Sequence, residues 1–215
     1  MKYSIIVPVF NRPDEVDELL GSLCSQTQKD FEVLIVEDGS QKTCKDVCDK
    51  YAGILDLHYY LKENSGPGQS RNYGAERAQG KWLIILDSDV VLPEGYMAAI
   101  DSDINHQTSD IAAFGGPDAA HESFTPVQKA ISYSMTSFFT TGGIRGSSSP
   151  KGGMKGALDK FFPRPFNMGI RRDVYLQLGG FSKMRFGEDI DFSYRIVEAG
   201  YKTALIPEYW NNAYS

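Results

Sequence analysis

The first half of the chain repeats one pattern: a short apolar run, a polar or glycine-rich turn, and a segment with helical spacing. The apolar runs lie within residues 4–10, 31–40, 57–61 and 81–86. Strands and helices that alternate at these lengths form parallel crossover units, with helices on both faces of one sheet. We therefore predict a three-layer α/β fold in which helices cover both faces of a mostly parallel open sheet.

The first unit carries the clearest local signals. Residues 4–10, SIIVPVF, are almost all apolar and predict a buried strand. Asn11 is then a candidate helix cap, Pro13 suits a first helical turn, and two acids follow it at the positive end of the helix. The next apolar positions fall at helical spacing: Val16, Leu19, Leu20 and Leu23.

Length, charge and cysteine usage limit what the protein can be. With 215 residues and a net charge of −6, we expect one domain over 1–215 and no nucleic-acid partner. We expect no signal peptide, because the apolar run near the N-terminus is too short for one, and no run approaches the roughly 18 apolar residues of a membrane span. Cys24, Cys44 and Cys48 form an odd set, which favours a reducing cytoplasm. Cys44 and Cys48, one helical turn apart, could share a metal, but small buried hydrophobes are the preferred interpretation.

The regular alternation weakens after residues 111–114. Residues 140–158 are rich in glycine and serine and contain basic residues without an acid. Two interpretations stay open for them: a flexible linker loop, or a mobile acceptor-facing lid that orders when substrate binds. Helical spacing returns in residues 188–200, and a final strand candidate follows.

Two acids that end the fourth apolar run carry a chemical signal. On an extended strand Asp87 and Asp89 point the same way, while Ser88 points elsewhere. Together the acids can hold a hard divalent cation, Mg²⁺ or Mn²⁺, which keeps water and substrate phosphates as its other ligands. The alternative is that Asp87 caps the next helix and Asp89 is solvated.

The loops at the carboxyl ends of parallel strands converge on one crevice. We therefore expect residues 8–11, 37–40 and 87–89 to meet there. Asp38 can accept a hydrogen bond from the N–H of a base, and Gly39 lets the backbone approach a ligand closely. The alternative for this pair is an ordinary Asp-Gly turn.

Two further stretches supply a cation and a cluster of acids. Arg71 lies near the start of a predicted helix and could pair with phosphate or with the acids, although its segment lacks the known glycine-rich phosphate fingerprints. Glu188, Asp189 and Asp191 gather at another helix N-terminus, which favours negative charge. Asp191 is interpreted as a simple first-turn acid. A carboxylate at the edge of a crevice that holds a cation and phosphates is placed to accept a proton.

Five motifs, in order, resemble those of the family 2 glycosyltransferases of the GT-A fold, inverting enzymes that use nucleotide-diphosphate sugars. They are SIIVPVFNR, VLIVEDGS, GPGQSRNYG, GKWLIILDSDV and GGFSKMRFGEDIDFSYRIVEAGYK, which together span nearly the whole chain. The resemblance implies a Rossmann-like sheet, a nucleotide-sugar-binding half at 1–115 and an acceptor and catalytic-base half at 116–215. The Q-x-x-R-W motif of processive synthases is absent, which implies the bacterial non-processive type that transfers one sugar.

The resemblance assigns residues to a donor site. Asp38 matches the acid that reads the base, usually uracil, and Arg71 matches an arginine near the nucleotide and the diphosphate. Asp87 and Asp89 match the metal-binding D-x-D motif, with Asp89 the direct ligand. The residues expected to bind the nucleotide sugar are Pro8, Phe10, Asn11, Glu37, Asp38, Gly39, Arg71, Asp87 and Ser88.

The resemblance also assigns the chemistry. Asp189 matches the catalytic base, and Glu188 is expected to orient it or to contact the acceptor. We expect a metal-dependent transfer, with Mn²⁺ or Mg²⁺, of a sugar from a UDP-sugar to a hydroxyl of a glycan or lipid-linked saccharide. The alternative is a catalytically inactive domain that binds nucleotide sugars; a nicotinamide-dependent dehydrogenase is disfavoured because its fingerprint is missing.

The second half is expected to determine the acceptor, within residues 117–165. A lipid-linked acceptor would bring the protein to the inner face of the membrane as a peripheral protein. The aromatic pairs Phe138, Phe139, Phe161 and Phe162 could help there, although core packing is the preferred interpretation. Relatives continue with a histidine that adds to the metal site, so we expect a C-terminus truncated after residue 215.

Overall fold

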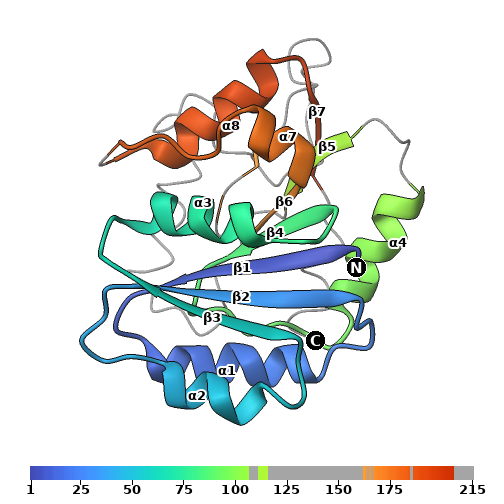
Figure 1. Cartoon of the computed structure of the whole chain (residues 1–215). Helices are drawn as coiled ribbons and strands as arrows, with labels where there is room; N and C mark the ends of the chain where they lie inside the picture. The colour runs from blue at the N-terminus through green and yellow to red at the C-terminus, as the bar shows by residue number, and fades with distance from the viewer. Residues whose placement is uncertain (107–110, 116–161, 164, 166, 185, 206–215) are drawn as a thin grey trace, which may run out of the picture.

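The computed structural model describes residues 1–106, 111–115, 162–163, 165, 167–184 and 186–205 of the chain. Within these residues seven strands form one sheet with the spatial order β3-β2-β1-β4-β6-β5-β7 (Figure 1). In chain order the strands are β1 (Tyr3–Val9), β2 (Phe31–Asp38), β3 (Leu57–Lys62), β4 (Trp82–Leu86), β5 (Ile111–Gly115), β6 (Asn167–Arg171) and β7 (Lys202–Leu205).

Neighbouring strands in this sheet are parallel except at β6. β1 pairs in parallel with β2 and β4, β2 with β3, and β5 with β7. β6 runs antiparallel between β4 and β5, so that Asn167 pairs with Leu86 at the end of β4 and Met168 with Gly115 at the end of β5. The mostly parallel open sheet predicted from the sequence is confirmed.

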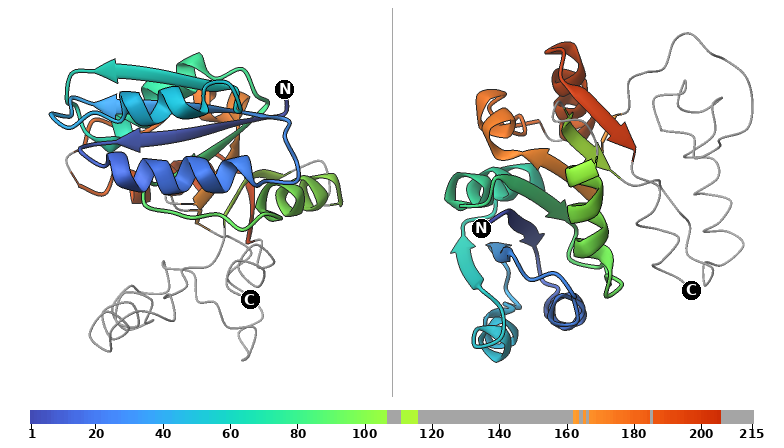
Figure 2. Two further views of the ribbon diagram at one scale, coloured as in Figure 1. Left: turned by 90° about the horizontal axis from the view of Figure 1, so that it is seen from below. Right: turned by 90° about the vertical axis from the view of Figure 1, so that its right-hand side faces the viewer.

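Six helices of the described part of the chain cover the two faces of the sheet (Figures 1 and 2). They are α1 (Pro13–Cys24), α2 (Lys45–Tyr51), α3 (Pro67–Arg77), α4 (Tyr96–His106), α7 (Arg172–Gln177) and α8 (Glu188–Glu198). One buried cluster joins α1, α2 and α4 to one face, and a second joins α3, α7 and α8 to the other. The predicted three-layer arrangement is therefore confirmed.

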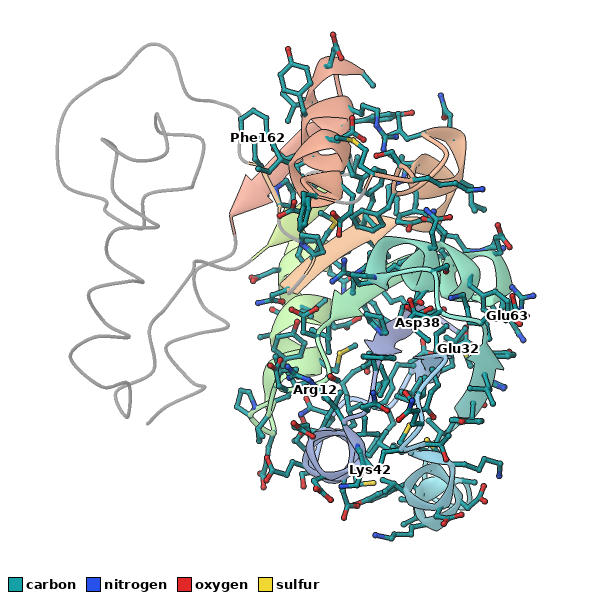
Figure 3. All side chains as sticks on the ribbon, turned by 90° about the vertical axis from the view of Figure 1, so that its left-hand side faces the viewer. Arg12, Glu32, Asp38, Lys42, Glu63 and Phe162 are labelled. Carbon is teal, nitrogen blue, oxygen red and sulfur yellow. The ribbon has the colours of Figure 1, made fainter. Side chains whose placement is uncertain are left out.

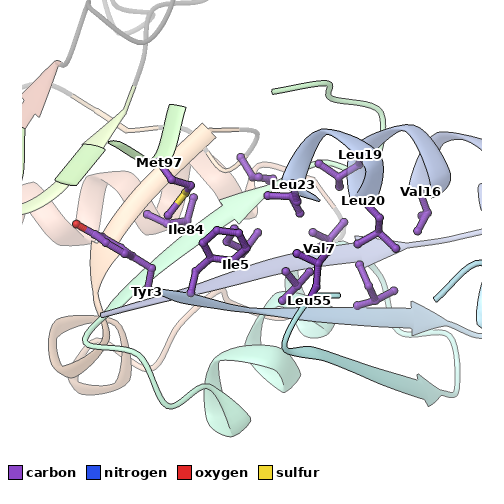
Figure 4. Packing of buried hydrophobic residues seen from close by; sticks show 14 of the residues in the cluster. Tyr3, Ile5, Val7, Val16, Leu19, Leu20, Leu23, Leu55, Ile84 and Met97 are labelled. Atoms are coloured by element: carbon purple, nitrogen blue, oxygen red, sulfur yellow. The ribbon is translucent and has the colours of Figure 1, made fainter. Parts of the chain in front are cut away.

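The central strand β1 supplies both cores, because successive side chains on a strand point to opposite faces. Ile5 and Val7 pack with Leu20 and Leu23 of α1 (Figure 4), whereas Ile6 packs on the side of α3. All five side chains are fully buried. Burial of such a side chain contributes roughly 1.5–3 kcal/mol, so contacts on both faces explain the apolar residues of β1.

The start of α1 corrects one prediction. Pro13 stands at the first helical position and acids fill the first turn, as expected, but Arg12 occupies the cap position and its side chain makes no capping hydrogen bond. Asn11 is therefore not the cap. Its backbone is left-handed, with φ 56°, and its side chain bonds the next loop instead: Oδ1 accepts hydrogen bonds from the amides of Gln41 (2.8 Å) and Lys42 (3.0 Å).

Several expectations fall on residues about which the structure gives no description. Residues 140–158 lie outside the described residues, as do the first three of the four aromatic residues suggested for a membrane role; Phe162 is half-buried. The division into halves at 115 and 116 stays a prediction. All three cysteines are free, and Cys44 and Cys48 are buried, as their interpretation as small hydrophobes requires.

Among the helices within the described ranges, none combines the length and the apolar character needed to cross a membrane.

Substitution of Gly169 tests the close packing of β6 against β5. Its partner Phe114 is 1% exposed, and a Cβ added at Gly169 would stand 1.9 Å from Phe114 Cζ. We expect Gly169→Ala to lower the free energy of unfolding by about 1–3 kcal/mol through overpacking, measured by urea denaturation. Gly95→Ala is the control, since an added Cβ there meets nothing within 4 Å, and we expect a change below about 0.5 kcal/mol. Equal effects of the two substitutions would contradict this packing.

Candidate functional site

The carboxyl ends of β1, β2 and β4 open onto one cleft of about 320 Å³. Figure 3 looks onto this edge of the sheet, where Asp38 and Arg12 are labelled. The residues that line the cleft are Pro8, Val9, Phe10, Arg12, Asp38, Pro67, Asp87, Ser88 and Asp89. The structure thus brings together the three polar strand ends that the sequence analysis expects to converge.

The two acids after β4 each pair with an arginine from another loop or helix. Asp87 Oδ1 accepts a hydrogen bond of 2.9 Å from Arg71 Nη2, and Asp89 Oδ2 accepts one of 2.7 Å from Arg12 Nη1. The next helix begins only at Tyr96, so the alternative in which Asp87 caps it is wrong. Both acids remain accessible, with side chains 40% and 53% exposed.

Arg71 lies in the first turns of α3 and is almost fully buried, with 6% of its surface exposed. Its guanidinium packs over the ring of Phe181, with the central carbon 5.3 Å from the ring centroid. Its Nε is buried, and within the described chain no acceptor lies in reach of it. A buried donor without an acceptor is unfavourable, so the described structure leaves one donor of this guanidinium unsatisfied.

Asp38 is fixed by the loop that leads into α3. Oδ1 accepts hydrogen bonds from Lys62 Nζ and from the amide of Ser65 (2.9 Å), and Oδ2 accepts one from the amide of Gly66 (2.8 Å). Burial raises the pKa of this carboxyl, but the three hydrogen bonds outweigh burial and hold the pKa below its ordinary value. Since a carboxylate has about four acceptor positions, one position on Oδ2 stays available in the cleft.

Three residues predicted for the nucleotide site have other surroundings. Glu37 is fully buried and accepts hydrogen bonds from the Cys44 amide (3.0 Å) and the Tyr59 hydroxyl (2.6 Å). It points away from Asp38 because adjacent side chains on a strand face opposite sides. Asn11 bonds the neighbouring loop, as described above. Gly39 has a left-handed backbone, with φ 71°, and an added Cβ there would meet the Asn64 amide at 2.8 Å.

Two cations of the site, Arg12 and Lys62, were not predicted from the sequence. Arg12 directly follows a strand end that was expected at the crevice, and Lys62 ends β3, which neighbours the strand of Asp38. The usable signal was a basic residue at a strand end or in the loop after it, because acids that converge at one edge of a sheet require cations nearby.

Glu188 and Asp189 begin α8 after Gly187, whose φ of 81° suits glycine. Asp189 precedes Phe192 by three residues and Ser193 by four, so it shares their inward-facing stripe; it stays half-exposed because the first turn extends beyond the core. Glu188 Cγ lies 3.2 Å from the position of a Cβ on Gly68 at the start of α3. Neither acid is among the described residues that line the cleft.

The other acid of this turn, Asp191, pairs with Arg195 one helical turn later, at 2.9 Å. Because Arg195 is in the same helix, this pair stabilises α8 itself. Its interpretation as a structural first-turn acid is therefore confirmed.

The turn at 178–181 contains Gly179 and Gly180 and is called the glycine turn below. Hydrogen bonds attach it to both α3 and α8. Asn72 of α3 donates a hydrogen bond to the carbonyl of Phe181 and accepts one from its amide, each 2.8 Å long. Arg195 of α8 donates to the carbonyls of Leu178 and Gly180, each at 2.7 Å. The helix that carries Arg71 and the helix that carries Asp189 are therefore attached to the same turn.

The oxygen atoms of Asp87 and Asp89 are the candidate metal ligands. Within the described ranges, no group of three or more His, Cys, Asp or Glu side chains could hold a metal ion. Two carboxylates that leave further positions to water and phosphate suit Mg²⁺ or Mn²⁺, which favour oxygen ligands. The donor set present therefore fits a hard divalent cation.

Comparison with known proteins identifies relatives over most of the chain. The family described as "Glycosyl transferase family 2" matches residues 4–179. An uncharacterized glycosyltransferase of Haemophilus influenzae is 30% identical over 207 residues, which cover 91% of this chain and 62% of that protein. The poly(ribitol-phosphate) beta-N-acetylglucosaminyltransferase TarS of Staphylococcus aureus is 34% identical over 115 residues, 52% of this chain and 20% of TarS. The chain thus spans less than two thirds of each of these relatives.

Solved structures share the fold. The crystal structure of S. aureus TarS 1-349 superposes with a TM-score of 0.74 at 22% identity, covering 97% of this chain and 58% of that one. TarS 1-349 in complex with UDP-GlcNAc gives 0.73 at 22% identity, covering 97% and 56%. The mannosyltransferase PcManGT from Pyrobaculum calidifontis, in complex with GDP-Man and Mn²⁺, gives 0.67 at 18% identity, covering 96% and 55%. The predicted GT-A fold is confirmed.

The lowered pKa of Asp38 makes its contribution to stability depend on pH. A carboxyl with a lowered folded-state pKa stabilises the fold above its unfolded pKa, about 3.9 for Asp, and loses this contribution as the pH falls through the folded value. We expect Asp38→Asn to lower the free energy of unfolding by about 2 kcal/mol at neutral pH, and by progressively less below pH ~4.

Thermal unfolding across this pH range measures the difference. Asp49→Asn is the control, because Asp49 forms an exposed ion pair with Lys45 outside the cleft and should cost less than about 1 kcal/mol. A constant deficit of Asp38→Asn at every pH would refute the ionised state of Asp38.

Proposed function

The chain belongs to glycosyl transferase family 2, and on this basis we propose that it transfers a sugar from a nucleotide-diphosphate donor to an acceptor hydroxyl. The observation that carries the proposal is the cleft at the carboxyl edge of the sheet. Asp38 and the two acids after β4 line it, and the buried cation Arg71 pairs with one of those acids, Asp87. The base of a nucleotide would meet Asp38, a divalent cation would meet the two acids, and the diphosphate would meet the cation and Arg71.

We infer that uracil is the preferred base. Asp38 has one acceptor position left after its three hydrogen bonds. Uracil offers one ring N–H to such a position, whereas guanine offers adjacent ring and exocyclic donors that would need two acceptors. The UDP and UDP-GlcNAc complexes of TarS support the same choice for a relative of this fold.

Asp89, with Asp87 beside it, would hold the divalent cation. A bound cation would offset the negative charge that develops on the leaving diphosphate. Arg71 would assist from the protein side, because its guanidinium lies beside Asp87 and guanidinium groups bind phosphate strongly. Asp87, Asp89 and Arg71 would thereby stabilise the leaving diphosphate.

Asp189 is proposed as the general base. Its carboxylate takes the proton of the acceptor hydroxyl as the hydroxyl oxygen attacks the anomeric carbon, and the bond from that carbon to the diphosphate oxygen breaks. Attack from the side opposite the diphosphate inverts the anomeric carbon in one displacement. The support is positional: Asp189 lies in the first turn of α8, the helix that the glycine turn attaches to α3. Within the described residues no hydrogen bond or ion pair to its carboxylate is found.

The acceptor is proposed as a glycan or a lipid-linked saccharide, at the cytoplasmic face of the membrane in the second case. The name of one relative, TarS, gives poly(ribitol-phosphate) as the molecule it acts on, and this supports a hydroxyl-bearing acceptor.

Donor binding is the direct test of the proposal. UDP with Mn²⁺ should raise the thermal unfolding midpoint of the protein more than either alone, since a ligand that binds the folded state stabilises it by about 2.7 kcal/mol at 100 times its Kd. Scanning fluorimetry with UDP, GDP, dTDP and NAD under the same conditions measures the shift. A shift with NAD alone, or none with any nucleotide, would refute the proposal.

Asp189→Asn tests the base. We expect turnover to fall about 10²- to 10⁴-fold, the usual contribution of a general base, with UDP affinity within about twofold of the wild type because binding does not use the proton transfer. Glu198→Gln, an exposed substitution in the last turn of the same helix, should leave both unchanged. Donor binding with no turnover in the wild type would instead favour the catalytically inactive binding domain.

A further inference from the structure

Arg12 lines the cleft but has no part in the donor site proposed above. We propose that Arg12 is a temporary partner of Asp89 and then a ligand of the donor. In the cleft without donor it pairs with Asp89, and it transfers to the diphosphate when a divalent cation takes its place on that carboxylate. This inference rests on the proposed function, because it needs a diphosphate and a cation in the same cleft.

The contact between the two side chains is close but exposed. Arg12 Nη1 lies 2.7 Å from Asp89 Oδ2, and the side chains are 46% and 53% exposed. Water screens an ion pair of this exposure and makes it weak. Within the described part of the chain Asp89 has no other hydrogen-bond partner. The pair therefore holds Asp89 in the cleft and is easily exchanged.

The backbone that carries Arg12 is held in place, so the guanidinium can move alone. The carbonyl of Arg12 accepts a hydrogen bond of 3.2 Å from Val16 in the first turn of α1. The preceding residue, Asn11, is left-handed, and its amide donates to Ser40 Oγ at 2.8 Å. A long side chain on an anchored backbone moves between two nearby partners by rotation about its own bonds.

Arg71, the other arginine of the site, differs from Arg12 in its exposure. Arg71 is buried under Phe181 and pairs with Asp87, and no rearrangement is required of it. Arg12 is exposed and occupies Oδ2 of Asp89, the acid expected to ligate the metal directly. A guanidinium and a divalent cation repel one another at such separations, so a cation that uses this oxygen displaces Arg12.

The exchange leaves every charge in the cleft with a partner. The cation replaces the guanidinium on Asp89, and a phosphate oxygen replaces Asp89 on the guanidinium. Arginine suits the second partner because its planar donors match phosphate oxygens in pairs. Arg12 therefore couples metal entry to diphosphate binding.

The test measures binding. Free Mn²⁺ is followed by electron paramagnetic resonance without nucleotide, and UDP affinity is measured by calorimetry at saturating Mn²⁺. Arg12→Gln should bind Mn²⁺ about two- to fivefold more tightly, since the weak competing ion pair is gone. The same variant should bind UDP about three- to tenfold more weakly, since a charged hydrogen bond to phosphate is lost.

Arg171→Gln is the matched control. Arg171 forms an exposed ion pair with Asp173 and pairs in the sheet with Trp82, at the edge opposite the cleft. This variant removes the same charge and should change neither affinity. In an Asp89→Asn background, Arg12→Gln should no longer tighten Mn²⁺ binding, because the shared carboxylate is absent.

The outcomes separate the two proposals. If wild-type protein binds Mn²⁺ and UDP and Arg12→Gln alters neither, this inference is overturned and the proposed function stands. Weaker Mn²⁺ binding by Arg12→Gln also overturns it, because Arg12 would then support the metal site and not compete for it. Wild-type protein that binds neither ligand refutes the proposed function, and this inference with it.

Discussion

The cleft depends on the pairing of each acid at its wall with a cation from a different segment. Three carboxylates near the ends of β2 and β4 would repel one another and raise one another's pKa values, yet Asp38, Asp87 and Asp89 each have a partner within hydrogen-bonding distance. These partners come from β3, α3 and the β1–α1 loop, so the same pairs that stabilise the charges also fix the loops. The same ion pairs therefore determine both the geometry of the cleft and its electrostatics.

A second constraint joins the two halves of the proposed chemistry. The turn at 178–181 accepts hydrogen bonds from Asn72 on one side and Arg195 on the other, and its Phe181 packs against Arg71. Leaving-group contacts on α3 and the carboxylate at the start of α8 are thus held on a common support. Gly180 makes this possible, because its left-handed backbone and missing Cβ leave room for the Asn72 side chain.

Much of the fold follows from the sequence, because the apolar runs of β1, β2 and β4 are buried on both faces and parallel strands converge at one edge. That logic located Asp38 and the acids after β4 correctly in one cleft. It misplaced Asn11, whose role depends on a neighbouring loop, and gave Glu37 a nucleotide contact although strand alternation turns it into the core. It missed Arg12, since the partner of Arg12, Asp89, lies 77 residues away in the sequence, and the local signal of a basic residue after a strand end was not used.

The antiparallel course of β6 has an evolutionary consequence. Gly115 ends β5 beside Met168, and Asn167 begins β6 beside Leu86, so β5 ends and β6 begins at the sheet edge that bears the cleft. Met168, Gly169 and Ile170 each pair with both neighbouring strands, so the register of β6 is fixed from two sides. A lineage could therefore change the length of the sequence between these two strands while it inherits their order and register.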